Sequence, residues 1–83
     1  MRCRLVPRYY FHLFNSETVL DEDGAEFANV DAALDQARTL ARDMAAQSVR
    51  GGSLTLHHRI EIAGDGGEVV AKVHFRDVVE VRE

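Results

Sequence analysis

Several residue types are scarce in this chain, and each scarcity excludes a class of protein. The 83 residues include no tryptophan, one proline and one cysteine. Because Cys3 has no second cysteine to pair with, a disulfide-stapled secreted scaffold is excluded, and we expect a cytoplasmic protein. No apolar run approaches the roughly 20 residues of a membrane-spanning helix, and none follows the N-terminal arginines as in a signal peptide. We therefore expect no membrane as a partner.

Positive charge is scarce as well. The chain has 10 Lys and Arg residues against 14 Asp and Glu residues, a formal net charge of -4. Phosphate backbones repel an acidic domain, so no nucleic acid is expected as a partner. A domain of this length buries only about 60% of its unfolded surface, and oligomerisation is a usual source of further stability. We expect residues 1–83 to form a single domain in which residues 1–6 are a flexible extension.

What the chain does have is a dense aromatic segment near its start. Residues 7–14 read PRYYFHLF and hold four of the six aromatic residues. This run of β-favouring residues predicts a strand with something to cover on both faces. Alternation divides it into two sets, Tyr9, Phe11 and Leu13 on one face and Tyr10, His12 and Phe14 on the other. Only one set can face a helix. The other set either forms an interaction surface or is covered by the tail or the loops.

The first half of the chain predicts a hairpin. A turn at Asn15-Ser16 leads from a strand at residues 8–14 into a short strand at residues 17–20. Residues 25–27 are too few to assign, and a bulge at Gly24 would let them continue the second strand.

A long helix follows the hairpin. Asn29 is a favourable N-cap, and apolar residues at helical spacing predict a helix from Val30 to Val49 with one face built to lie on a sheet. Gly51-Gly52 supplies the left-handed backbone with which helices commonly end.

The last third predicts a second hairpin, because Asp65-Gly66 between two alternating runs is typical of a two-residue turn. Pairing Gly64 with Gly67 fixes a register. On the apolar face this register pairs Ile62 with Val69, Ile60 with Ala71, His58 with Val73, and Leu56 with Phe75. On the other face it pairs His57 with His74, Arg59 with Lys72, and Glu61 with Val70. The tail from Arg76 is expected to form a helical turn around Asp77-Val78-Val79 or a frayed extension.

The predicted order is β-β-α-β-β. It indicates an α+β fold of two layers, a mainly antiparallel sheet with one long helix packed on one face. The order of the strands within the sheet stays open, because the helix could bring the second hairpin beside either strand of the first.

Histidines suggest a metal or small-ligand site. His57 and His74, opposite each other in the predicted register, are near enough to share an ion on the open face of the sheet. Zinc normally takes three or four ligands, so His12 or a carboxylate such as Glu61 would have to complete the site. The adjacent His58 points to the other face, since neighbours on a strand alternate.

Catalysis is not expected. An enzyme needs a nucleophile or an acid/base pair held in a pocket, and no serine has an evident histidine partner in its local sequence. The acidic residues 21–24 lack the spacing of a calcium loop, and the glycines at 64–67 lack the ending of a phosphate loop. We expect no cofactor.

Several ordered motifs resemble a family of small alphaproteobacterial proteins that begin PRYFFH and are described only as a domain of unknown function. They are PRYYFH at residues 7–12, DEDGAEF at residues 21–27, the alanine-rich helix, and VHFRDV at residues 73–78. The resemblance implies a fold but no activity, cofactor or catalytic residue. A weaker similarity, to the N-terminal domain of HicB-type antitoxins, implies an antitoxin-like regulatory partner protein.

The sequence therefore predicts a non-enzymatic protein-interaction module. Self-association, through the open sheet face or the edge of the first strand, and an unknown protein partner are both left open. The alternatives are metal or small-ligand binding through the histidines, and the antitoxin-like role.

Overall fold

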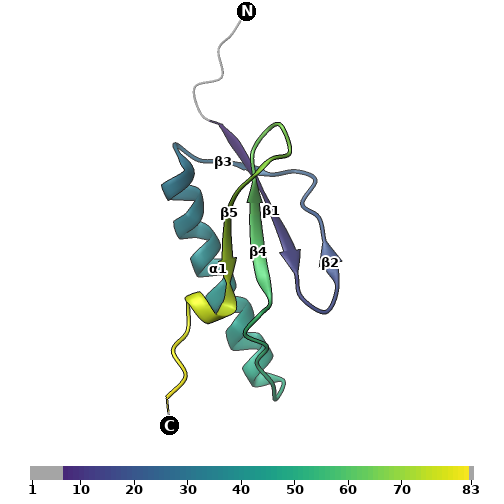
Figure 1. The fold of residues 1–83 in the computed structure, drawn as a ribbon, viewed down its shortest axis with the longest axis vertical. Coiled ribbons are helices and arrows are strands. Elements are labelled where there is room, and N and C mark those ends of the chain that lie inside the picture. The colour runs from purple at the N-terminus through teal and green to yellow at the C-terminus, as the bar shows by residue number, and fades with distance from the viewer. Residues whose placement is uncertain (1–6, 83) are drawn as a thin grey trace, which may run out of the picture.

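The computed structural model describes residues 7–82. The extension expected at residues 1–6, which contains Cys3, lies outside the described residues. One long helix lies against one face of an antiparallel sheet (Figure 1), so the predicted α+β class is confirmed. None of the helices in the described part of the chain has the length and apolar character needed to cross a bilayer.

The sheet has five strands, and their order places the aromatic strand in the interior. The strands are β1 (Arg8–Phe14), β2 (Thr18–Val19), β3 (Ala25–Glu26), β4 (Arg59–Ala63) and β5 (Val69–His74). They run in the order β2-β1-β4-β5, with β3 also paired to β1. Strand β1 pairs with β4 from Tyr10↔Ala63 to Phe14↔Arg59. Self-association through the edge of β1 is therefore a wrong prediction, because both edges of this strand are occupied within the chain.

The first hairpin continues past a break in its second strand. Val19 pairs with Leu13, and after the bend at residues 20–24 Ala25 pairs with Tyr9 on the same side of β1. Gly24 has a φ of 67°, a left-handed conformation that favours glycine. The suggested continuation of the strand beyond Gly24 is confirmed.

Helix α1 (Val30–Arg50) begins and ends where its signals predict. The side chain of Asn29 accepts a hydrogen bond from the backbone N–H of Ala32 at 2.9 Å. At the other end, the N–H of Ser53 donates to Ser48 and that of Gly52 to Val49, the two bonds of a Schellman motif. Gly52 is the left-handed residue, with a φ of 105°.

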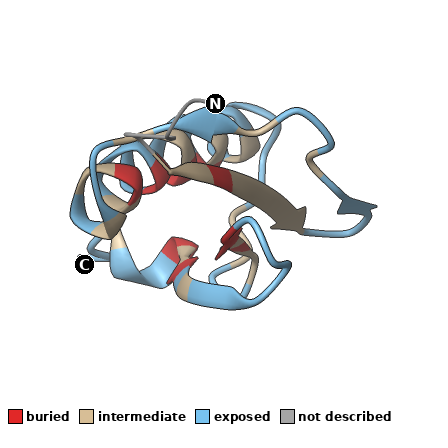
Figure 2. Cartoon of the chain, turned by 90° about the horizontal axis from the view of Figure 1, so that it is seen from above, coloured by how far each residue is buried: buried red, intermediate tan, exposed pale blue. Residues whose placement is uncertain are grey.

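The core lies between the helix and the sheet. Four alanines at four-residue spacing, Ala33, Ala37, Ala41 and Ala45, are the buried residues of α1. Their small side chains let the helix approach β4 and β5, where Ile60, Ile62 and Val73 are buried. Phe75, in the 3-10 turn η1 (Phe75–Asp77), is buried at the end of β5. Figure 2 shows the buried residues on the facing sides of the two layers. The tail therefore does begin with a helical turn, two residues earlier than predicted.

The second hairpin has a different turn from the predicted one. The N–H of Gly67 donates to Gly64 at 3.0 Å, and the N–H of Gly64 donates to Glu68 at 2.9 Å. The loop therefore has three residues, and Gly67, with a φ of 88°, closes it. A bulge between Ile62 and Ala63 then leaves Val70 without a partner in β4.

The third residue of the turn and the bulge residue Val70 each shift the register by one. Every predicted pair is therefore wrong. The observed pairs are Arg59 with His74, Ile60 with Val73, Glu61 with Lys72, Ile62 with Ala71, and Ala63 with Val69. From Ile62↔Ala71 to Arg59↔His74 the shift is two residues, so these side chains stay on their predicted faces. Val69, predicted on the apolar face, instead pairs with Ala63, the partner of Tyr10, and lies on the other face.

Candidate functional site

The structure decides which aromatic set of β1 faces the helix. Tyr9 is only 7% exposed, and Phe11 and Leu13 pack against the core. Phe27, just before α1, lies with its ring centroid 5.7 Å from that of Phe11. Tyr9, Phe11 and Leu13 therefore belong to the interior, which removes them as an interaction surface.

The other set lies on the face that the helix does not cover. Tyr10, His12 and Phe14 are each half-buried. Alternation places them beside the outward residues of the neighbouring strands, and we call this surface the open face. Its residues are Tyr10, His12 and Phe14 of β1, Arg59 and Glu61 of β4, and Lys72 and His74 of β5.

Phe14 and its neighbours form a cluster with fixed geometry. The guanidinium carbon of Arg59 lies 4.4 Å from the centroid of the Phe14 ring, a cation–π contact. Its Nε donates to Oε2 of Glu61 at 2.7 Å, and the Glu61 side chain is only 12% exposed. Each of these three side chains restricts the conformations of the next. The Phe14 ring is therefore held in place by contacts within the chain.

Asp21 lies in the gap between β2 and β3, where no strand pairs with this side of β1, and its side chain supplies hydrogen bonds there. One carboxylate oxygen accepts from the N–H of Phe11 and the other from the N–H of Asp23 and of Gly24, all at 3.1 Å. The N–H of Asp21 donates to Nδ1 of His12 at 3.0 Å. Burial raises the pKa of Asp21, but the three backbone hydrogen bonds and the neighbouring His12 outweigh it and lower the pKa below its usual value. Asp21 therefore ties the edge of the sheet to the His12 ring.

The Tyr10 ring packs directly against Gly24. A Cβ at this position would lie 2.8 Å from Cε2 of Tyr10 and 2.9 Å from Cγ of Arg8. Only a residue without a side chain leaves room for the Tyr10 ring. The sequence indicated a bend at Gly24 but gave no sign of this contact, which depends on the pairing of β3 with β1.

The histidines do not come together as predicted. His57 lies in the loop before β4, and His74 pairs with Arg59. His12 lies opposite Glu61 on β4 and is bonded to Asp21. Over residues 7–82, no group of three or more His, Cys, Asp or Glu side chains is placed to hold a metal ion. The cross-strand His57/His74 pair is therefore wrong, for the same reason as the register.

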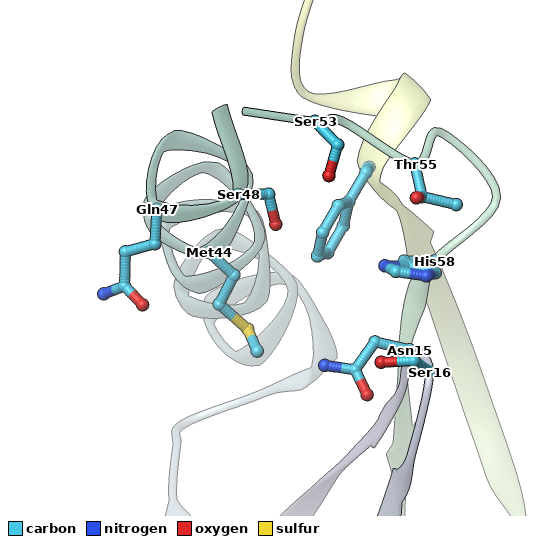
Figure 3. Close-up of a pocket in the computed structure, with 9 residues that line it drawn as sticks. Asn15, Ser16, Met44, Gln47, Ser48, Ser53, Thr55 and His58 are labelled. Atoms are coloured by element: carbon cyan, nitrogen blue, oxygen red, sulfur yellow. The ribbon is translucent and has the colours of Figure 1, made fainter. Parts of the chain in front are cut away.

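A pocket that the sequence did not indicate lies at the far end of the helix. It has a volume of about 500 Å³ and is lined by Asn15, Ser16, Met44, Gln47, Ser48, Ser53, Thr55, His58 and Phe75. Figure 3 shows Met44 and Ser48 of α1 on one side and Thr55 and His58 on the other. The His58 ring packs against Phe75 with centroids 5.5 Å apart. Among the hydrogen bonds of residues 7–82, none joins the His58 ring to a serine or threonine hydroxyl.

Comparison with known proteins gives a family and no function. Residues 8–76 match the family described as a domain of unknown function, DUF6894. No curated protein and no solved structure matches the chain. The predicted resemblance to a domain of unknown function is thus confirmed, whereas the similarity to HicB-type antitoxins stays a prediction.

Proposed function

The chain belongs to the DUF6894 family, a domain of unknown function, and from the geometry of its sheet we propose that it is a non-enzymatic protein-interaction module whose contact surface is the open face. The observation that carries this proposal is the Phe14–Arg59–Glu61 cluster. Aromatic residues and arginine are the residue types that contribute most to protein interfaces.

Binding through the open face would cost little side-chain conformational entropy, because several of its side chains are already held in place. Freezing a flexible side chain on binding costs about 0.5–1.5 kcal/mol. Here Phe14 and Arg59 are already in contact at 4.4 Å, and Asp21 holds His12. These side chains are therefore already ordered in the folded domain, and binding would immobilise few of them further.

The charges on the open face favour a protein over a nucleic acid. Arg59 is paired with Glu61 at 2.7 Å, and Lys72 lies opposite Glu61 on the next strand. Positive and negative groups thus alternate, and the whole chain has a net charge of -4. Phosphate backbones are bound by uncompensated basic patches. A cytoplasmic location is part of the same proposal.

Site-specific photo-crosslinking in the native cell tests the proposal. Phe14 is replaced by p-benzoylphenylalanine, which keeps an aromatic ring at the position, and the matched control carries the same residue at Gln36, an exposed position on the helix. We expect a discrete adduct with another protein from position 14 and none from position 36. No adduct from position 14, or the same adducts from both positions, would contradict the proposal.

A further inference from the structure

One apolar row of the helix stops before the helix does. Leu40 and Met44, four residues apart, both pack against the core. The next position in this row is Ser48, in the last turn of a helix that ends at Arg50. An apolar side chain at this position would continue the row. The helix therefore presents a hydroxyl group at this end of the core.

The sheet presents a polar side chain at the same end. His58 precedes Ile60 and Ile62 at two-residue spacing, and both isoleucines are buried. Alternation places His58 on the side of the sheet that the helix covers, and its ring packs against Phe75. Figure 3 shows Ser48 and His58 directed from opposite sides into the pocket of about 500 Å³ between them. Positions that the apolar pattern assigns to the core are thus polar in both layers, and such departures are expected at functional sites.

The helix does not use the Ser48 hydroxyl. Thr39, the other hydroxyl residue of α1, donates to the carbonyl of Asp35 at 3.2 Å, a bond that helical serines and threonines commonly make. Over the described residues 7–82, no hydrogen bond joins the side chains of Ser48, Thr55 or His58 to another group of the chain. All three side chains line the pocket. The pocket therefore contains donors and acceptors that a ligand can use.

The lining also determines the charge of such a ligand. Of the residues within 7–82 that line the pocket, none is Lys, Arg, Asp or Glu. A charged group entering the pocket would lose hydration without meeting a counterion, which is costly. The pocket therefore favours an uncharged ligand.

The chemistry of the lining favours hydroxyl groups on the ligand. The serine and threonine hydroxyls and the carboxamides of Asn15 and Gln47 each offer both a donor and an acceptor, and alcohol groups match them because they also do both. A planar base is instead held by stacking on an aromatic face. Phe75 is only 1% exposed and does not present such a face. A polyol therefore fits the pocket better than a base.

We propose that this pocket binds an uncharged, polyhydroxylated molecule of about monosaccharide size, with the Ser48 and Thr55 hydroxyls and the His58 ring as its polar contacts. The volume of about 500 Å³ lies in the lower part of the range of small-molecule sites, about 300–1,000 Å³. The site is separate from the open face, because it lies on the side of the sheet that the helix covers.

Titration of the isotope-labelled full chain, followed through its backbone amide NMR signals, tests the proposal. The neutral probes are glucose and myo-inositol. We expect at least one of them to shift the amides of Ser53 and Thr55 with saturation at millimolar concentration, while the amide of Lys72 on the open face does not move. Glucuronate, which carries a carboxylate on the same ring as glucose, and uridine, which carries a planar base, should each bind more weakly than that probe.

Three variants assign the binding to the pocket. Ser48→Ala should weaken binding of the neutral probe about fivefold, the effect of one lost hydrogen bond, and it should fold because alanine favours a helix. Thr39→Ala, the matched control, removes the hydroxyl that already bonds within the helix and should leave the affinity unchanged. Ser48→Leu continues the apolar row into the pocket and should abolish binding in a chain that still unfolds cooperatively in urea.

Several results would overturn the proposal. They are the absence of a saturable shift with both neutral probes, tighter binding of glucuronate or uridine, and an affinity that Ser48→Ala leaves unchanged or that Thr39→Ala lowers equally. Binding that persists in a folded Ser48→Leu variant would place the ligand elsewhere on the chain and overturn it as well.

Discussion

Replacing Gly24 by alanine should be much more damaging than the same replacement elsewhere in the chain. At a φ of 67° an alanine Cβ approaches its own backbone, which costs about 1–2 kcal/mol. The added Cβ would also lie 2.8 Å from Cε2 and 2.9 Å from Cδ2 of Tyr10. Overpacking of this kind costs about 1–3 kcal/mol more. We therefore expect Gly24→Ala to lower the free energy of unfolding by about 2–5 kcal/mol.

Two other glycines separate these contributions. Gly52 also has a positive φ, 105°, but no atom lies within 4 Å of its added Cβ, so Gly52→Ala should show the backbone cost alone. Gly51 has a φ of -83°, and its Cβ would meet the Ser48 carbonyl at 3.5 Å. Gly51→Ala should therefore be close to neutral.

Urea unfolding followed by circular dichroism measures all three variants. The contact with Tyr10 is isolated by repeating Gly24→Ala in a Tyr10→Ala background, where the added Cβ meets no ring. The loss caused by Gly24→Ala should then fall by about 1–3 kcal/mol. If Gly24→Ala costs no more than Gly52→Ala, or if removing the Tyr10 ring makes no difference, the steric reasoning is refuted.

Two further predictions concern the ends of the first hairpin and of the helix. Because the pKa of Asp21 is lowered in the folded state, its contribution to stability is present above its unfolded pKa of about 3.9 and is lost as the pH falls through the folded pKa. Unfolding curves from pH 6 down to pH 2 should show a steeper loss for the natural chain than for Asp21→Asn, and parallel losses would disprove this role. Asn29→Ala should cost about 1 kcal/mol and Asn29→Asp much less, because the aspartate still accepts from the N–H of Ala32; equal losses by urea unfolding would exclude the cap.

Features encoded by neighbouring residues could be predicted from the sequence. The helix N-cap at Asn29 and the glycine ending are local, and the structure has both within one residue of the prediction. The division of β1 into two sets follows from alternation alone. Which set is inside could not be predicted, because it depends on which side of the sheet α1 crosses.

Features that depend on competition between similar turns could not be predicted. The run Gly64-Asp65-Gly66-Gly67 allows both a two-residue turn on Asp65-Gly66 and a three-residue turn closed by Gly67, and the chain adopts the second. The hydrophobic pattern cannot distinguish them once the bulge at Val70 restores the period, because both registers keep Ile60 and Ile62 inside. The predicted His57/His74 pair is wrong for this reason and because β4 begins at Arg59, which leaves His57 in the preceding loop.

The alanine stripe of α1 has a consequence for how the helix is positioned along its axis. Ala33, Ala37, Ala41 and Ala45 are equivalent side chains repeated every four residues, so sliding the helix by about one turn, roughly 6 Å, would place alanine on alanine again. The stripe thus sets how deeply the helix sits but leaves its axial position degenerate. Unique contacts outside the stripe must remove that degeneracy. They are Phe27, packed on Phe11 before the helix begins, and Arg42, whose Nε donates to the carbonyl of Val78 at 3.2 Å.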